Sequence, residues 1–85
     1  MNTVTPERLE EVIVKEQYHF FEGTTLCVCV LTLTNGFTVT GESACADPKI
    51  FSADTGRKYA RENAQNKIWM LEGYFLKQKL FEESK

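Results

Sequence analysis

The stretch LCVCVLTLTNGFTVTGESA, residues 26–44, decides the fold. Its first part is rich in Val, Leu, Thr and Cys, which suits a strand over residues 24–34. Asn35-Gly36 follows and is the strongest short hairpin signal, because a type I′ turn needs positive φ at both central residues. The chain is therefore expected to return as a second strand over residues 37–44.

A two-residue loop also predicts the register of this hairpin. Thr34 is expected to face Phe37, and Thr32 to face Val39. The first strand is apolar on both faces while the returning strand is mixed. The first strand is therefore expected to be the central strand of a three-stranded antiparallel meander.

The residues upstream predict a helix and the remaining strand. Thr5-Pro6-Glu7 combines a hydroxyl cap, a proline at the first helical position and an acid in the first turn, which starts a short helix over 6–13. Residues 14–21 then alternate, with Val14, Tyr18 and Phe20 on one face, as a strand does. The expected sheet therefore spans 14–45.

The rest of the chain predicts one long helix. Ser52 is a plausible cap, and residues 53–81 contain no proline and only two glycines. Such a helix is roughly 40 Å long. The expected architecture is a single α+β domain over residues 1–85, in which the meander follows a short helix and packs against the long C-terminal helix.

The long helix carries more apolar surface than one sheet needs. Ala60, Ala64, Ile68, Leu71 and Phe75 form a stripe that is expected to cover the sheet. A second stripe lies on nearly the opposite side, where a surface helix should be polar. We therefore expect a homo-oligomer, dimer or higher. The alternative is that the N-terminal helix covers the second stripe. The expected oligomer interface is Trp69, Met70, Leu76 and Leu80.

The composition limits which classes of function are expected. The net charge of −2 argues against general nucleic-acid binding, although it leaves room for a small anionic ligand. Three cysteines without a CxxC pair predict neither a disulfide framework nor a zinc site, and they favour a reducing cytoplasm. No signal peptide is expected at the N-terminus, and no apolar run is long enough for a membrane. No cofactor or metal is expected.

Catalytic chemistry is not expected either. His19 is the only histidine, and a lone strand histidine is more often structural than catalytic. Glu42 and Ser43 are neighbours on a strand, so their side chains project to opposite faces and cannot act on one point. The sequence therefore predicts a binding protein rather than an enzyme.

Arg57 and Arg61 are the candidate ligand-binding pair. They are i,i+4 neighbours in or beside the core stripe of the long helix, near its N-terminus, where anions are favoured. One interpretation is a bound phosphate or other anion. The alternative is an ion pair with Asp54, Glu42, Asp47 or a neighbouring subunit. The candidate residues for stacking on or reading a base are Phe37, Tyr59 and Asn63.

Several strings together resemble one family. They include NGFTVTGESACADP at 35–48, ARENA at 60–64, and KIW and LEGY at 67–69 and 71–74. In order and spacing they resemble the small tailed-phage family named for phage N4 gene 49 and phage Sf6 gene 66. The resemblance implies a phage or prophage accessory gene expressed in the bacterial cytoplasm, with no established enzyme activity.

A weaker resemblance concerns function. Phage anti-Thoeris sponge proteins are similar in outline, with a small sheet, long helices and an oligomer, and they sequester cyclic nucleotide signals of host defence. By this resemblance Arg57 and Arg61 would hold phosphates, and Phe37 or Tyr59 would stack on a base. The leading hypothesis is thus sequestration of a small anionic nucleotide signal. The alternative is a module that inhibits or redirects a host protein through the apolar surface of the long helix.

Overall fold

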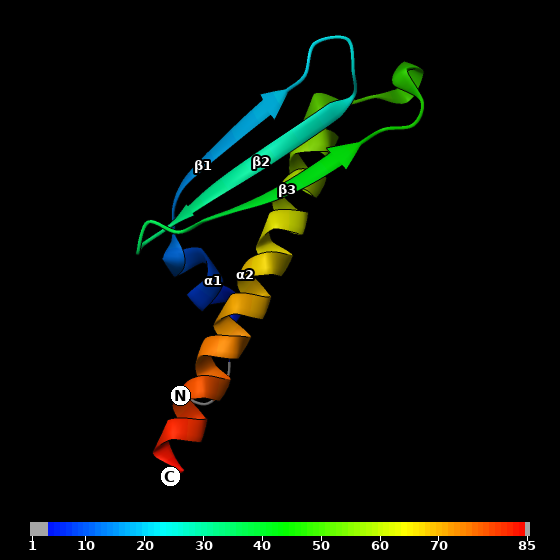
Figure 1. Cartoon of the computed structure of the whole chain (residues 1–85). Helices are drawn as coiled ribbons and strands as arrows, with labels where there is room; N and C mark the ends of the chain where they lie inside the picture. The colour runs from blue at the N-terminus through cyan, green and yellow to red at the C-terminus, as the bar shows by residue number, and fades with distance from the viewer. Residues whose placement is uncertain (1–3, 85) are drawn as a thin grey trace.

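The computed structural model describes residues 4–84 and has the expected α+β architecture (Figure 1). The expectation of no signal peptide concerns a segment whose first three residues lie outside the described part. A short 3-10 helix, η1, precedes the long helix. The elements are α1 (Pro6–Val12), β1 (Ile13–Phe20), β2 (Leu26–Leu33), β3 (Thr38–Ala44), η1 (Pro48–Ile50) and α2 (Ala53–Glu83).

Both α-helices begin where their capping residues predict. The Thr5 hydroxyl accepts from the Arg8 N–H at 3.2 Å, and Pro6 occupies the first turn of α1. The Ser52 hydroxyl likewise accepts from the Thr55 N–H, at 3.4 Å, and starts α2. These side chains satisfy amides that have no partner inside the helix.

The sheet is an antiparallel meander in the order β1-β2-β3, so β2 is central as expected. The predicted register is wrong by one residue: Thr32 pairs with Thr38, and Leu31 pairs with Val39. The Leu33 N–H bonds to the Phe37 carbonyl at 2.8 Å, which closes a three-residue loop rather than a two-residue one.

The conformation of Asn35 explains the shift in register. Within residues 4–84, positive φ is confined to glycines, among them Gly36 at 89°. Asn35 therefore does not enter the left-handed region that a type I′ turn requires. The Gly36 N–H bonds instead to the Leu33 carbonyl at 2.9 Å, and the loop includes Thr34. This is the common three-residue hairpin with glycine at the left-handed position.

A bulge in β1 changes which side chains meet α2. The register shifts between Ile13 and Lys15, so Val14 is exposed, contrary to the expectation that it shares a face with Tyr18. Ile13, expected to end the first helix, begins the strand instead. Beyond the bulge, Glu16 pairs with Leu31 and lies on the same face as Tyr18. Glu16 thus lies on the helix-facing side by its two-residue spacing from Tyr18, and the bulge removes Val14 from that side.

Helix α2 packs across one face of the sheet at very short range. Ala60, Ala64 and Ile68 are fully buried against it. A Cβ placed on Gly41 of β3 would lie 2.2 Å from the Ala60 carbonyl oxygen and from the Ala64 amide nitrogen. Gly41 and the two alanines therefore set the spacing between helix and strand. The buried core comprises Leu9, Val12, Cys27, Cys29, Leu31, Leu33, Val39, Ala60, Ala64 and Ile68.

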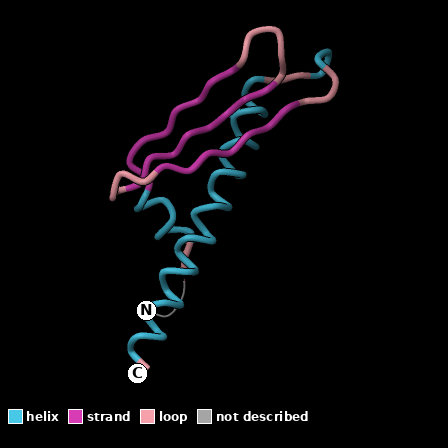
Figure 2. Tube along the Cα trace, in the orientation of Figure 1, coloured by secondary structure: helices cyan, strands magenta, loops and turns pink. Residues whose placement is uncertain are grey.

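The C-terminal half of α2 extends beyond the sheet (Figure 2). An eight-residue strand covers about 26 Å, whereas the 31 residues of α2 span about 46 Å. Leu71 and Phe75, expected to cover the sheet, are consequently 40% and 52% exposed. The radius of gyration is 15.7 Å, well above the roughly 12 Å of a compact domain this size. We call residues 69–83 the projecting half of α2.

Within residues 4–84, no helix combines the length and the hydropathy needed to cross a membrane.

Candidate functional site

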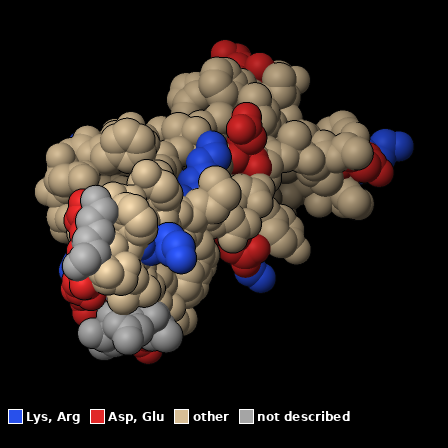
Figure 3. Space-filling view, turned by 60° about the horizontal axis from the view of Figure 1, so that its bottom comes forward, with Lys and Arg blue, Asp and Glu red and all other residues tan. Residues whose placement is uncertain are grey.

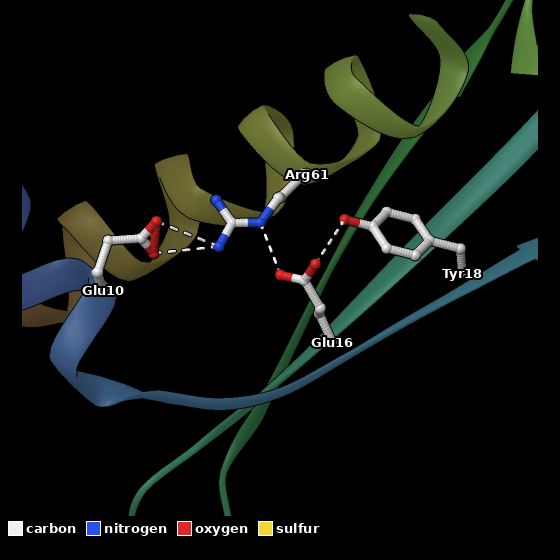
Figure 4. Close-up of polar contacts among 4 residues, drawn as sticks. All are labelled: Glu10, Glu16, Tyr18 and Arg61. Atoms are coloured by element: carbon white, nitrogen blue, oxygen red, sulfur yellow. Dashed lines mark hydrogen bonds and ion pairs between the residues drawn. The ribbon is translucent and has the colours of Figure 1, made fainter. Parts of the chain in front are cut away.

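Arg61 lies at the centre of a polar cluster between α1, β1 and α2 (Figure 4). Its Nε donates to Glu16 Oε2 at 2.8 Å, and one terminal nitrogen donates to both carboxylate oxygens of Glu10, at 3.0 and 3.2 Å. The side chain is only 25% exposed. The hydrogen bonds to Glu10 and then to Glu16 raise the pKa of the guanidinium. The two carboxylates thus surround one guanidinium, and their hydrogen bonds connect α1, β1 and α2.

The Tyr18 hydroxyl extends this cluster. It donates to Glu16 Oε1 at 3.4 Å, beside the oxygen that holds Arg61 (Figure 4). Burial raises the pKa of Tyr18 to about 12, with further contributions from Cys29 and Glu16. The phenol is therefore neutral over the whole physiological range and acts as a hydrogen-bond donor.

Arg57 has a looser arrangement, one turn nearer the start of α2. It forms an ion pair with Asp54, one of the partners weighed from the sequence. Its guanidinium carbon lies 5.7 Å from the centre of the Phe20 ring. The two charged side chains are 40% and 91% exposed, so water competes for both of them. Arg57 is held mainly by its packing on Phe20.

The other predicted ligand residues lie elsewhere on the molecule. Asn63 donates from Nδ2 to the Glu42 carbonyl at 2.8 Å, on the β3 side of α2 rather than the β1 side. Tyr59 is exposed and lines a hollow of about 240 Å³ together with the end of β3. Phe37 is exposed in the β2–β3 turn, at the opposite end of the sheet from Phe20 and Arg57. The five residues do not converge on one site.

The residues weighed for catalysis have structural contacts. The Ser43 hydroxyl donates to the Gly56 carbonyl at 2.6 Å, and Glu42 projects to the other face. The His19 ring packs edge-on against Phe21, with centroids 4.5 Å apart. Cys27 is fully buried, and burial raises the pKa of its thiol. Residues 4–84 contain no cluster of three side chains suited to hold a metal ion.

Helix α1 runs beside α2 without covering the second apolar stripe. Arg8 Nε bonds to Glu72 Oε1 at 2.7 Å and fixes the two helices side by side. Trp69 and Leu80 stay exposed, and Leu76 is half-buried at a groove of about 550 Å³ between the helices. Covering by the N-terminal helix, the alternative to an oligomer, is therefore partial at best.

The sequence reasoning missed the partners of Arg61 and the groove. Glu10 and Glu16 are far from Arg61 in sequence, and strand alternation places Glu16 on the face of Tyr18 without showing which residue of α2 meets that face. On the face seen in Figure 3, acidic and basic groups are interspersed. That face carries no basic stripe of the kind that tracks a nucleic-acid backbone.

Comparison with known proteins identifies the relatives of this chain. No curated protein and no solved structure matches it. A family model does match, over residues 4–80, which include every strand and most of α2. The chain belongs to the phage protein family of N4 Gp49 and phage Sf6 gene 66.

Proposed function

We propose that this protein is a non-enzymatic phage accessory protein that binds a host protein in the bacterial cytoplasm through the projecting half of α2. The observation that carries the proposal is the exposure of Leu71, Tyr74 and Phe75, at 40%, 71% and 52%. Large apolar side chains gathered on one exposed surface typically mark an interaction site. We call these three residues the partner face.

The spacing of the partner face suggests how it binds. Leu71, Tyr74 and Phe75 are at i, i+3 and i+4, the pattern by which an amphipathic helix enters an apolar groove on another protein. The aromatic residues Tyr74 and Phe75 suit such an interface, because aromatic anchors often dominate binding energy. The expected partner therefore offers an apolar groove of at least about one helical turn.

Capture from a host lysate tests the proposal. The tagged protein should recover one stoichiometric host protein, and Tyr74→Ala combined with Phe75→Ala should lose it. Glu62→Ala is the matched control, because Glu62 is exposed on the opposite side of the same helix. Loss with the control, or retention with the double variant, would contradict the role of the partner face.

Binding of a small anionic ligand, such as a cyclic nucleotide signal, is the second candidate. Arg57 supports it, because an exposed ion pair contributes little and phosphate could displace Asp54. Arg61 supports it less, since two carboxylates already surround its charge. Neither Phe37 nor Asn63 lies beside Arg57 to read a base.

Calorimetric titration with cyclic ADP-ribose isomers and cyclic oligonucleotides tests this second candidate. Arg57→Ala should abolish any binding while Lys58→Ala, its exposed neighbour, should preserve it. A flat response across the ligands would rule the candidate out.

A further inference from the structure

A second pattern on α2 lies apart from the partner face. Trp69, Gly73, Leu76 and Leu80 follow one another at intervals of four, three and four residues, and we call them the seam. This is the heptad spacing by which two helices pack side by side. Trp69, Gly73 and Leu80 are exposed, and Leu76 is half-buried. A Cβ added to Gly73 would meet nothing within 4 Å, so the space above it is open.

We infer that the seam binds the seam of a second copy of this chain, with the two α2 helices antiparallel. One antiparallel register sets Trp69 against Leu80 of the second copy and Gly73 against its Leu76. Each leucine at position 76 then enters the space left by the facing glycine. The register is self-complementary, as a two-fold dimer requires.

Charges on the flanks of the seam fit the same register. Glu72 and Lys79 lie on one flank, about 90° or less from the seam. In the antiparallel pair Lys79 of the second copy comes within about 3 Å, along the helix axis, of the level of Glu72, which already pairs with Arg8 of α1. Glu11 of α1 lines the same groove and is the acid that this flank offers to the second copy. On the other flank Met70 faces the apolar stem of Lys77.

The antiparallel direction also avoids two costs of a parallel pair. Parallel helices would place Gly73 against Gly73 and leave a void in the middle of the seam. They would also bring two sheets to the same end, whereas the sheet lies along only the N-terminal part of α2 and α1 lies beside its middle (Figure 1). Antiparallel packing places the two sheets at opposite ends.

The inference is independent of the proposed function. The centre of the partner face lies about 180° around α2 from the centre of the seam by the helical repeat, and the two surfaces adjoin where Phe75 and Leu76 line the groove beside α1. A dimer joined at the seams would therefore leave Leu71 of both partner faces free. Dimerisation and host-protein capture can be lost separately.

Light scattering after size exclusion gives the first test. The full chain at micromolar concentration should have about twice the 9.7 kDa mass of one copy. Leu76→Glu and Gly73→Lys should each weaken the dimer about tenfold or more, because either buries a charge in the seam. Leu71→Glu, on the side of α2 opposite the seam, should leave the mass unchanged. Circular dichroism should show that all three fold; for Gly73→Lys the reason is that a Cβ at position 73 would meet nothing within 4 Å.

A monomer of the unmodified chain would overturn the inference. It would do so even if Leu76→Glu then lost host-protein capture, because the seam would belong to that partner. A mass unaffected by both seam variants would equally overturn it.

Cysteine cross-linking tests the direction. In a Cys45→Ser background, Met70→Cys and Lys77→Cys chains carrying tags of different mass are mixed and oxidised. The antiparallel register brings these positions together between copies, while two copies of position 70 lie about 14 Å apart along the axis. A disulfide between the two tagged chains is expected. Only disulfides between identical chains, or none at all, would refute the antiparallel pair.

Discussion

Replacing Gly41 by alanine tests the packing that holds the fold together. The new methyl carbon would lie 2.2 Å from two backbone atoms of α2, about 1.2 Å short of an ordinary contact. Neither backbone atom can rotate aside as a side chain would. Helix α2 must therefore move away from β3 by about that distance.

The distance that α2 moves determines how much stability is lost. A gap of 0.5–1 Å already forfeits a quarter to a half of the dispersion energy across it. The gap would open along Ala60, Ala64 and Ile68, which are fully buried. Overpacking typically costs about 1–3 kcal/mol, and a backbone clash belongs at the upper end. We expect Gly41→Ala to lower the free energy of unfolding by about 3 kcal/mol.

Urea denaturation followed by far-ultraviolet circular dichroism measures the loss, at one protein concentration so that any association stays constant. Gly56→Ala makes the same chemical change in α2, where the nearest atoms would be 3.6 Å away. It should be neutral or stabilising by up to about 1 kcal/mol. A Gly41→Ala protein within about 0.5 kcal/mol of the unmodified chain would refute the close-packing argument.

Three further predictions follow from the polar cluster and the cysteines. Arg61→Met should lower the free energy of unfolding by about 1 kcal/mol, and by less in high salt, because salt screens the ion pairs of Arg61. Arg57→Met should change it by no more than about 0.5 kcal/mol, because its ion pair is exposed. Urea titrations in low and high salt compare the two variants. Because the pKa of Tyr18 is about 12 in the folded state and 10 unfolded, its contribution to stability is complete below pH 10 and lost as the pH rises through 12. Tyr18→Phe should flatten that alkaline decline in urea midpoints, and an unchanged decline would contradict the assignment. Of the three thiols, Cys45 should react with a thiol reagent in the native protein, while the buried Cys27 and Cys29 should react only on unfolding.

The element order was predictable because local signals agree with the final packing. Caps at Thr5 and Ser52, a proline in the first turn of α1 and an apolar central strand each act within a few residues. The register of the hairpin was not predictable in this way. Asn-Gly supports both a two-residue and a three-residue loop, and the choice depends on whether the asparagine adopts positive φ.

The roles of the arginines depend on contacts that local sequence does not contain. Arg61 meets Glu16 because strand pairing sets Glu16 opposite Leu31, on the helix-facing side of the sheet. Periodicity correctly placed both arginines near the core stripe, but it could not supply the carboxylates that neutralise Arg61. The candidate ligand residues were grouped by chemistry, whereas the fold divides them between the β1 and β3 sides of α2.

The structure shows, as the sequence predicted, that α2 has more apolar surface than the sheet covers, and it shows which side chains are left exposed. The sequence predicted two stripes, one for the sheet and one for a partner. The sheet is too short for its stripe, so Leu71 and Phe75 are left exposed beyond it. Burying them inside the chain would need a longer sheet or a second helix pair, and α1, at seven residues, is too short for that. The apolar side chains of the projecting half can therefore be buried only against another molecule. For this reason we assign the seam to a second copy and the partner face to a host protein.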